Sequence, residues 1–221
     1  MREVDRKYVI LLTVFIAVMA VLNVISAKLA LIPFWFAPVS AGIICYWLTF
    51  PITDAVGEVY GKANAMFLVW MGFVANILVL GLSAWAIALE PSELYAHQSA
   101  MENVLGSVPL IVIASLTAYL SAQLHDVWAY HFWKTITKGK HMWLRNNLST
   151  ISSQLIDSLI FNGIAFYLFG EVDWTFLDFL GTTLAYWMLK LCIAVVDTPL
   201  VYVLHYWLTG KWAPEPSSER A

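Results

Sequence analysis

Charged side chains are scarce in this chain. Only 12% of its 221 residues are Asp, Glu, Lys or Arg, whereas 61% are hydrophobic. Soluble domains average about 25% charged and about 45–50% apolar residues, so this composition excludes an ordinary soluble domain. The sequence predicts an all-α integral membrane protein, for which the lipid bilayer is the first partner.

Cysteines and catalytic motifs are scarce as well. The two cysteines, Cys45 and Cys192, cannot build a disulfide framework. The chain contains no P-loop, no HExxH, no GxSxG and no GxGxxG, and its five histidines are scattered. We therefore expect no metal, no cofactor and no enzymatic activity. The basic residues lie next to the predicted membrane ends, so we expect no nucleic-acid partner either.

Long apolar stretches are abundant instead. A helix needs about 20 residues to cross the hydrocarbon core, and six stretches reach that length: Tyr8–Lys28, Val39–Tyr60, Ala65–Leu89, Ser107–Trp133, Leu148–Phe169 and Phe176–Leu208. We predict one domain of six transmembrane helices over residues 1–212. The segment 213–221, rich in Pro, Ser and Glu, is predicted to be a disordered cytoplasmic tail.

The few charges outside these stretches are unequally distributed between the two sides of the membrane. Of the 12 Lys and Arg residues, all but Lys28 and Lys190 fall on the same set of alternate loops. The positive-inside rule places this side, and with it both termini, in the cytoplasm, which requires an even number of crossings. Only two connections are expected to be longer than a turn, the outward Glu90–Gly106 and the inward Lys134–Asn147.

Five ionisable side chains lie well inside the predicted helices: Asp54, Asp126, Asp157, Lys190 and Asp197. A charge in the hydrocarbon region costs at least about 2.5–3.5 kcal/mol. These side chains must therefore face one another, a polar solute or a water-filled path. Such positions are typical of proteins that move or sense something in the membrane.

The second predicted helix contains one of these carboxylates. Asp54 and Glu58 are four residues apart on one face, although Glu58 lies close enough to the membrane end to be simply solvated. Pro51 removes a backbone donor, which predicts a local break in the helix next to Asp54. Near the outer end of the first helix, we expect Asn23, Ser26 and Lys28 to be interfacial, with Lys28 reaching the headgroups.

The fourth and fifth predicted helices share a polar pattern in which a Gln precedes an Asp by three residues. The stripes are Ser115, Tyr119, Gln123 and Asp126 in the fourth helix and Thr150, Ser153, Gln154 and Asp157 in the fifth. Ser, Thr and Gln also join membrane helices at about 0.6 kcal/mol each. Such association does not need a carboxylate, so Asp157 is the strongest candidate for a functional site.

The sixth predicted helix contains Lys190 near its middle and Asp197 two turns towards the cytoplasm. A buried lysine either loses its proton or pairs with a carboxylate, and Asp157, at similar depth, is the expected partner. The alternative is a purely structural ion pair. The polar second and fifth helices occupy corresponding places in two three-helix halves, which is compatible with an inverted repeat like those of transporters.

These residues resemble a known family. The segments Thr53–Gly61, Ala114–Asp126, Trp143–Ser158 and Lys190–Tyr202 are similar, in order and in spacing, to motifs of the queuosine precursor transporter family, also called the vitamin uptake transporter family. The resemblance implies a six-helix carrier of the bacterial inner membrane that takes up 7-deazaguanine bases such as preQ0, preQ1 or queuine. The sequence does not determine whether the protein forms a homo-oligomer.

The resemblance also suggests how a guanine-like base would be held. A carboxylate accepts from an N–H and an amino group side by side, and an amide or ammonium donates to the carbonyl. The expected substrate-binding residues are Asp54, Ser115, Tyr119, Gln123, Asp126, Ser153, Gln154, Asp157, Lys190 and Asp197. Tyr119, Phe161 and Tyr186 are expected to stack on the base.

Two other functions remain open on the sequence alone. The chain could be the substrate-binding membrane subunit of a vitamin importer that is driven by a separate ATPase module. It could also be a membrane enzyme acting on lipid, with Asp54 and Asp126 as catalytic groups, although the missing metal and phosphate motifs speak against an enzyme.

Overall fold

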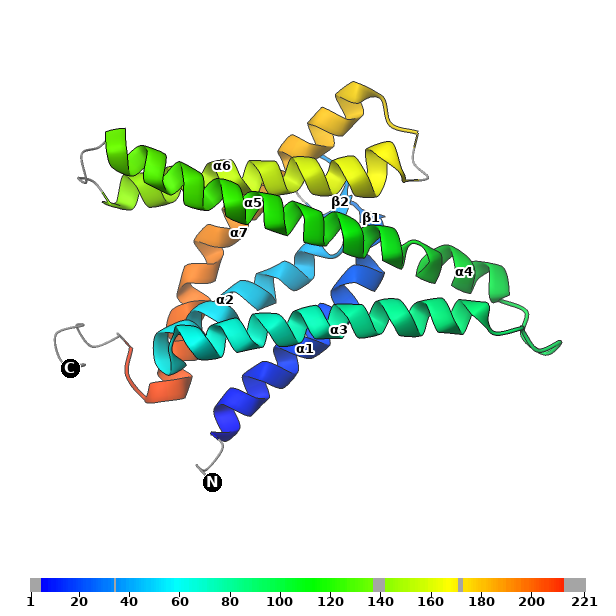
Figure 1. The fold of residues 1–221 in the computed structure, drawn as a ribbon, viewed down its shortest axis with the longest axis horizontal. Coiled ribbons are helices and arrows are strands. Elements are labelled where there is room, and N and C mark those ends of the chain that lie inside the picture. The colour runs from blue at the N-terminus through cyan, green and yellow to red at the C-terminus, as the bar shows by residue number, and fades with distance from the viewer. Residues whose placement is uncertain (1–4, 34, 137–141, 171–172, 213–221) are drawn as a thin grey trace. The chain divides into compact units, whose positions relative to one another are not determined.

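The computed structural model describes residues 5–33, 35–136, 142–170 and 173–212. The chain runs through α1 (Arg6–Ser26), β1 (Leu29–Ala30), β2 (Val39–Ser40), α2 (Ile43–Tyr60), α3 (Lys62–Ala88), α4 (Gln98–Gly106), α5 (Val108–Ile136), α6 (Met142–Asn162), the π-helix η1 (Gly163–Leu168) and α7 (Phe176–Thr209) (Figure 1). The predicted tail 213–221 lies outside the described residues.

Five helical segments in the described part of the chain are long and apolar enough to cross a membrane. They are Arg6–Ser26, Ala63–Ala88, Gln98–Ala122, Leu148–Leu168 and Phe176–Ile193. The helical membrane protein predicted from composition is therefore confirmed. The second predicted span does form a helix, α2, but α2 is not among these five, so the sixth crossing stays a prediction.

The connections differ from the prediction in three places. The outward segment contains a helix, α4, in which the Gln98 amide donates to the Glu102 carboxylate at 2.7 Å, a contact between side chains one turn apart. Between α1 and α2 lies a small antiparallel hairpin that pairs Leu29 with Ser40. The inward connection is shorter than expected, because α5 continues to Ile136 and α6 begins at Met142.

The described chain divides into two compact units. Unit 1 comprises Met1–Lys28, Ala41–Gly106 and Ile193–Ala221, and unit 2 comprises Leu29–Ser40 and Ser107–Cys192. The boundary after Gly106 falls where a three-plus-three division places it, but α7 contributes its first part to unit 2 and its last part to unit 1. An inverted repeat, like the single transmembrane domain, stays a prediction.

Unit 1 is built around α1, which packs against both α2 and α3. Leu11 and Phe15 of α1 lie in one buried cluster with Ile52 and Val56 of α2. A Cβ atom at Gly72 of α3 would lie 2.7 Å from Cε1 of Phe15. The missing side chain therefore lets α1 and α3 approach closely, as small residues do in membrane helix pairs.

The C-terminal part of α7 joins the same unit. The Lys7 ammonium donates to the carbonyl oxygens of Trp207 and Leu208, at 2.7 and 3.1 Å. These carbonyls belong to the last turn of α7, where no intrahelical donor follows. A lysine of α1 thus caps α7, and the favourable charge at a helix C-terminus adds to the contact.

Two expectations for unit 1 are wrong. Asn23 and Ser26 were predicted to be interfacial, but both are buried, and the Asn23 amide donates to Oδ1 of Asn76 in α3 at 2.8 Å. The helix α2 also continues through Pro51 without the predicted break. The Thr53 hydroxyl donates to the carbonyl oxygens of Thr49 and Phe50, which lie one turn earlier in the same helix.

Unit 2 consists mainly of α5 and α6, which lie side by side, and of η1, which continues α6 (Figure 1). Four alanines give α5 a smooth buried face; they are Ala114, Ala118, Ala122 and Ala129. Small residues at helical spacing allow close packing of membrane helices. The polar residues of the candidate site lie on α6 and on the first part of α7.

Candidate functional site

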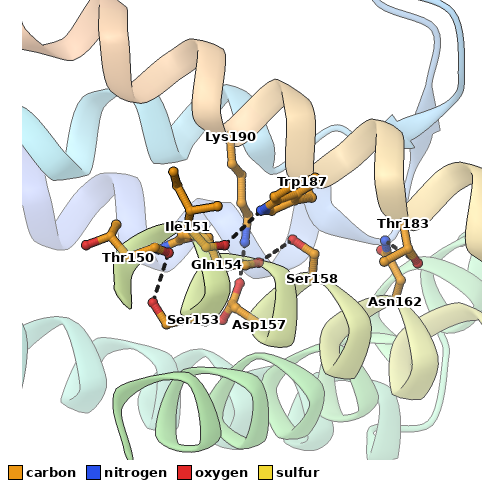
Figure 2. A network of polar contacts seen from close by, with 10 residues as sticks. All are labelled: Thr150, Ile151, Ser153, Gln154, Asp157, Ser158, Asn162, Thr183, Trp187 and Lys190. Carbon is orange, nitrogen blue, oxygen red and sulfur yellow. Dashed lines mark hydrogen bonds and ion pairs between the residues drawn. The ribbon is translucent and has the colours of Figure 1, made fainter. Parts of the chain in front are cut away.

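A buried ion pair joins α6 to α7 within unit 2. The ammonium of Lys190 donates to Oδ2 of Asp157, and Figure 2 shows the lysine side chain extending from α7 towards α6. Lys190 is only 8% exposed. The pairing of these two residues, predicted from the cost of burying either charge alone, is confirmed.

An aromatic pair lies beneath the ammonium group. The Lys190 nitrogen is 4.9 Å from the centre of the Tyr186 ring, one helical turn earlier on α7. Tyr186 is stacked on Phe161 of α6, with ring centres 6.0 Å apart and an interplanar angle of 17°. A cation within about 6 Å of a ring face is attracted by the ring electrons, most strongly where water is excluded. The lysine thus contacts an anion and an aromatic ring.

The hydroxyl groups near the pair are satisfied within their own helix. The Ser153 hydroxyl donates to the Thr150 carbonyl at 3.0 Å, and the Ser158 hydroxyl donates to the Gln154 carbonyl at 2.8 Å (Figure 2). These bonds keep the buried face of α6 polar without leaving its donors unpaired. The half-buried side-chain amide of Gln154, by contrast, bonds to none of the described residues.

Two neutral contacts flank the ion pair along α6. The indole N–H of Trp187 donates to the Ile151 carbonyl at 3.0 Å, and the Asn162 amide donates to the Thr183 hydroxyl at 3.3 Å (Figure 2). Sequence reasoning missed Asn162 and Thr183. The spacing held a signal, since Thr183 lies seven residues, or two turns, before Lys190 and therefore shares its face of α7.

The remaining predicted site residues are in several places. On α5, Ser115 is half-buried and Tyr119 is 50% exposed. Asp54 is exposed on α2, in unit 1. The side chains of Gln123, Asp126 and Asp197 lie outside the described part of the structure. The predicted residues that the described structure brings together are thus those of α6 and the first half of α7, namely Ser153, Gln154, Asp157 and Lys190.

Two of the three residues expected to stack on the base are buried against each other. Phe161 is 7% exposed and Tyr186 only 2%, and each ring covers the other. Neither ring is open to a base in this structure, so stacking of the base on these two residues stays a prediction. The sequence predicted aromatic side chains at this depth of the membrane, but it could not show that the two rings face each other.

The helices and the site together define a class of protein. Five helical segments of the described chain are long and apolar enough to cross a membrane. Between two helices lies a charge pair that helix packing does not require, an arrangement typical of multi-pass membrane transporters.

Comparison with known proteins agrees with this class. Residues 40–204 match the family described as "Putative vitamin uptake transporter". The chain is 30% identical over 162 residues to a Bacillus subtilis (strain 168) protein named "Probable queuosine precursor transporter", an alignment that covers 73% of this chain and 69% of the relative. No solved structure matches. The chain belongs to the vitamin uptake transporter family, and it is a multi-pass membrane protein.

Proposed function

We propose that the protein takes up queuosine precursors, that is, 7-deazaguanine bases such as preQ0, preQ1 or queuine, across the bacterial inner membrane. Membership of a transporter family supports uptake as the activity, and the name of the Bacillus relative supports this substrate class. The buried pair of Asp157 and Lys190 is the observation that supports a site for a polar, neutral solute.

The geometry of Asp157 suits the edge of a guanine-like base. Lys190 donates to Oδ2, and no other described residue donates to this carboxylate. In this proposal Oδ1 accepts from the base. A 7-deazaguanine offers an N–H and an amino group side by side, which a carboxylate accepts as a pair. Gln154 lies one turn before Asp157 on the same helix, and its amide can donate to the base carbonyl.

The other predicted contacts belong to the same proposal. Ser153 and Lys190 are already close to Asp157, and Tyr119, half exposed on α5, is the remaining candidate for stacking on the base. We include five further residues on the basis of the family motifs, namely Asp54, Ser115, Gln123, Asp126 and Asp197. They would contact the base or line its path.

The membrane topology is proposed from charge. Six crossings, with α2 as the additional one, place both termini in the cytoplasm and the basic loops on the inner side. The acidic segment around α4 then lies outside. This orientation delivers the base to the compartment in which it would be used.

Uptake of radiolabelled preQ1 by cells that cannot make the base, expressing this chain, tests the proposal. We expect accumulation above empty-vector cells. Asp157→Asn and Gln154→Ala should lower uptake by about tenfold or more at limiting substrate, because an unpaired buried partner costs about 1–3 kcal/mol. Ser152→Ala is a matched control, since this α6 hydroxyl bonds only to backbone carbonyls of its own helix in the described structure.

The outcomes separate the components of the proposal. Wild-type uptake by both variants would refute the site while leaving the substrate in place. A wild-type chain that inserts normally but accumulates no base would refute the function. The purified chain in liposomes should also take up the base without ATP, and failure there alone would point to a separate driving module.

A further inference from the structure

We propose that Tyr186 is a positioning residue that holds the Lys190 ammonium when the substrate takes the carboxylate of Asp157. The inference rests on the proposed function, because it concerns what happens to the ion pair when a base binds. It assigns a role to a buried ring that lies against the lysine of the ion pair.

The first step is competition for one carboxylate. In the structure the lysine donates directly to Asp157 Oδ2. A base that presents an N–H and an amino group side by side needs both carboxylate oxygens, since paired donors are recognised by paired acceptors. Each carboxylate oxygen can accept two donors, and in this proposal the amino group or N–H of the base takes the place of the ammonium at Oδ2.

The second step concerns where the displaced charge goes. Lys190 is 8% exposed, so its ammonium cannot simply turn into water. The Tyr186 ring lies 4.9 Å from the nitrogen before any movement, within the range of a cation–π contact. The lysine can lose its carboxylate contact and still keep a favourable electrostatic partner without leaving the site.

Phe161 fixes the ring in place. Its side chain is stacked on Tyr186 at 6.0 Å and is itself buried. The Tyr186 ring is therefore supported by Phe161, and its orientation is set before the substrate arrives. This preorganisation lowers the cost of moving the ammonium.

Helix packing alone does not explain this arrangement. The bonds of Trp187 to Ile151 and of Asn162 to Thr183 already join α6 and α7 on both sides of the ion pair. Neither bond contains a charge, so the two helices would be joined without Lys190. The ion pair is therefore not needed to join α6 to α7, and the proposal gives the lysine and the ring beneath it a role in substrate binding.

The test measures the concentration dependence of precursor uptake. Tyr186→Leu should raise KM by about 10- to 30-fold, since the ring contact stabilises the substrate-bound state. Tyr186→Phe keeps the ring and should restore most of that loss. Fluorinated phenylalanines at position 186 withdraw ring electrons at nearly constant volume, so KM should rise stepwise with each added fluorine.

Tyr167 provides the matched control. It lies in the neighbouring η1, where its ring stacks on Phe179 at 4.8 Å, and the described structure places no cation over it. The same fluorinated series at position 167 should leave KM unchanged. The inference is refuted if the series at 186 is also flat, or if Tyr186→Leu lowers only the amount of inserted protein. If the wild-type chain takes up no precursor, the proposed function fails and this inference fails with it.

Discussion

The two units bury polar groups between helices in different ways. In unit 1, α1 and α3 share a neutral pair of amides, Asn23 and Asn76, at 2.8 Å. In unit 2, α6 and α7 share a lysine and an aspartate. A neutral contact contributes only about 0.6 kcal/mol to helix association, whereas each buried charge costs several kcal/mol. The amide pair of unit 1 is therefore a contact that helix packing alone explains. The charge pair of unit 2 costs more than helix packing requires.

The units also differ in how closely their helices approach. Unit 1 relies on a missing side chain, because Gly72 leaves room for the ring of Phe15. In unit 2, long side chains such as Lys190 and Trp187 reach from α7 to α6. In the proposed function, the link through the long side chain of Lys190 is the one that a ligand replaces.

The largest expected effect separates folding from transport in unit 2. Lys190→Gln leaves Asp157 as an unpaired buried charge, and breaking such a pair costs about 3–5 kcal/mol of stability. Adding Asp157→Asn removes the remaining charge and should restore the unfolding midpoint in detergent. Uptake should stay at least tenfold below wild type in the double variant, because the site has lost its carboxylate.

The matching change in unit 1 is the control for that prediction. Replacing Asn23 and Asn76 together by Leu removes a buried polar pair but no charge, so uptake per inserted molecule should stay within about twofold of wild type. Normal uptake by the neutral double variant of unit 2 would instead make the ion pair purely structural, and the contrast between the units would disappear.

A moderate effect is expected from the close approach in unit 1. Gly72→Ala would place a Cβ atom 2.7 Å from the Phe15 ring, which is held in the core. Overpacking of this kind costs about 1–3 kcal/mol. Gly81→Ala on the same helix is the control, because a Cβ there meets nothing within 4 Å. Unfolding in detergent should distinguish the two variants, and KM should change in neither. Equal stability would show that α1 is not held by this contact.

The smallest effect concerns acid stability at the start of α1. The Tyr60 hydroxyl donates to Asp5 at 2.7 Å, and this bond, together with the Lys7 backbone N–H, lowers the pKa of the Asp5 carboxyl from its ordinary 3.8. Since the folded-state pKa is the lower one, the contribution is present above about pH 4 and is lost as pH falls through the folded pKa. Unfolding midpoints measured across acid pH should show it.

Asp5→Asn provides the comparison for that measurement. The variant cannot ionise at this position, so its stability should fall less steeply than that of wild type as the pH drops below about 4. Asp178 accepts hydrogen bonds from Thr175 at the start of α7. Asp178→Asn therefore tests whether this carboxylate contributes more or less acid stability than Asp5 at the start of α1. Parallel curves for wild type and Asp5→Asn would show that the bond to Tyr60 contributes nothing.

Much of the fold followed from the sequence, but not all of it. Apolar runs gave the helices to within a few residues, because crossing a hydrocarbon core requires length and apolar composition. The helix α4 and the hairpin of β1 and β2 were missed, since short elements have too few residues for a clear period. The predicted break at Pro51 was wrong because propensity is a weak prior that tertiary packing overrides.

The candidate site was only partly predictable. The cost of an unpaired charge was enough to pair Asp157 with Lys190, because both lie at similar depth in their helices. The burial of Tyr186 against Phe161, and the bond of Asn162 to Thr183, could not be inferred in the same way. These contacts depend on the rotation of α6 and α7 about their own axes.

The sequence by itself determined that this chain is an integral membrane protein and that the charges inside its helices need partners. Those properties follow from residue type, because transfer free energy depends on the side chain and not on its neighbours. Only the tertiary structure decided which neighbours meet. It placed a ring beneath the Lys190 ammonium and an amide pair inside unit 1, because the rotation and approach of packed helices are set by the fit of many side chains at once.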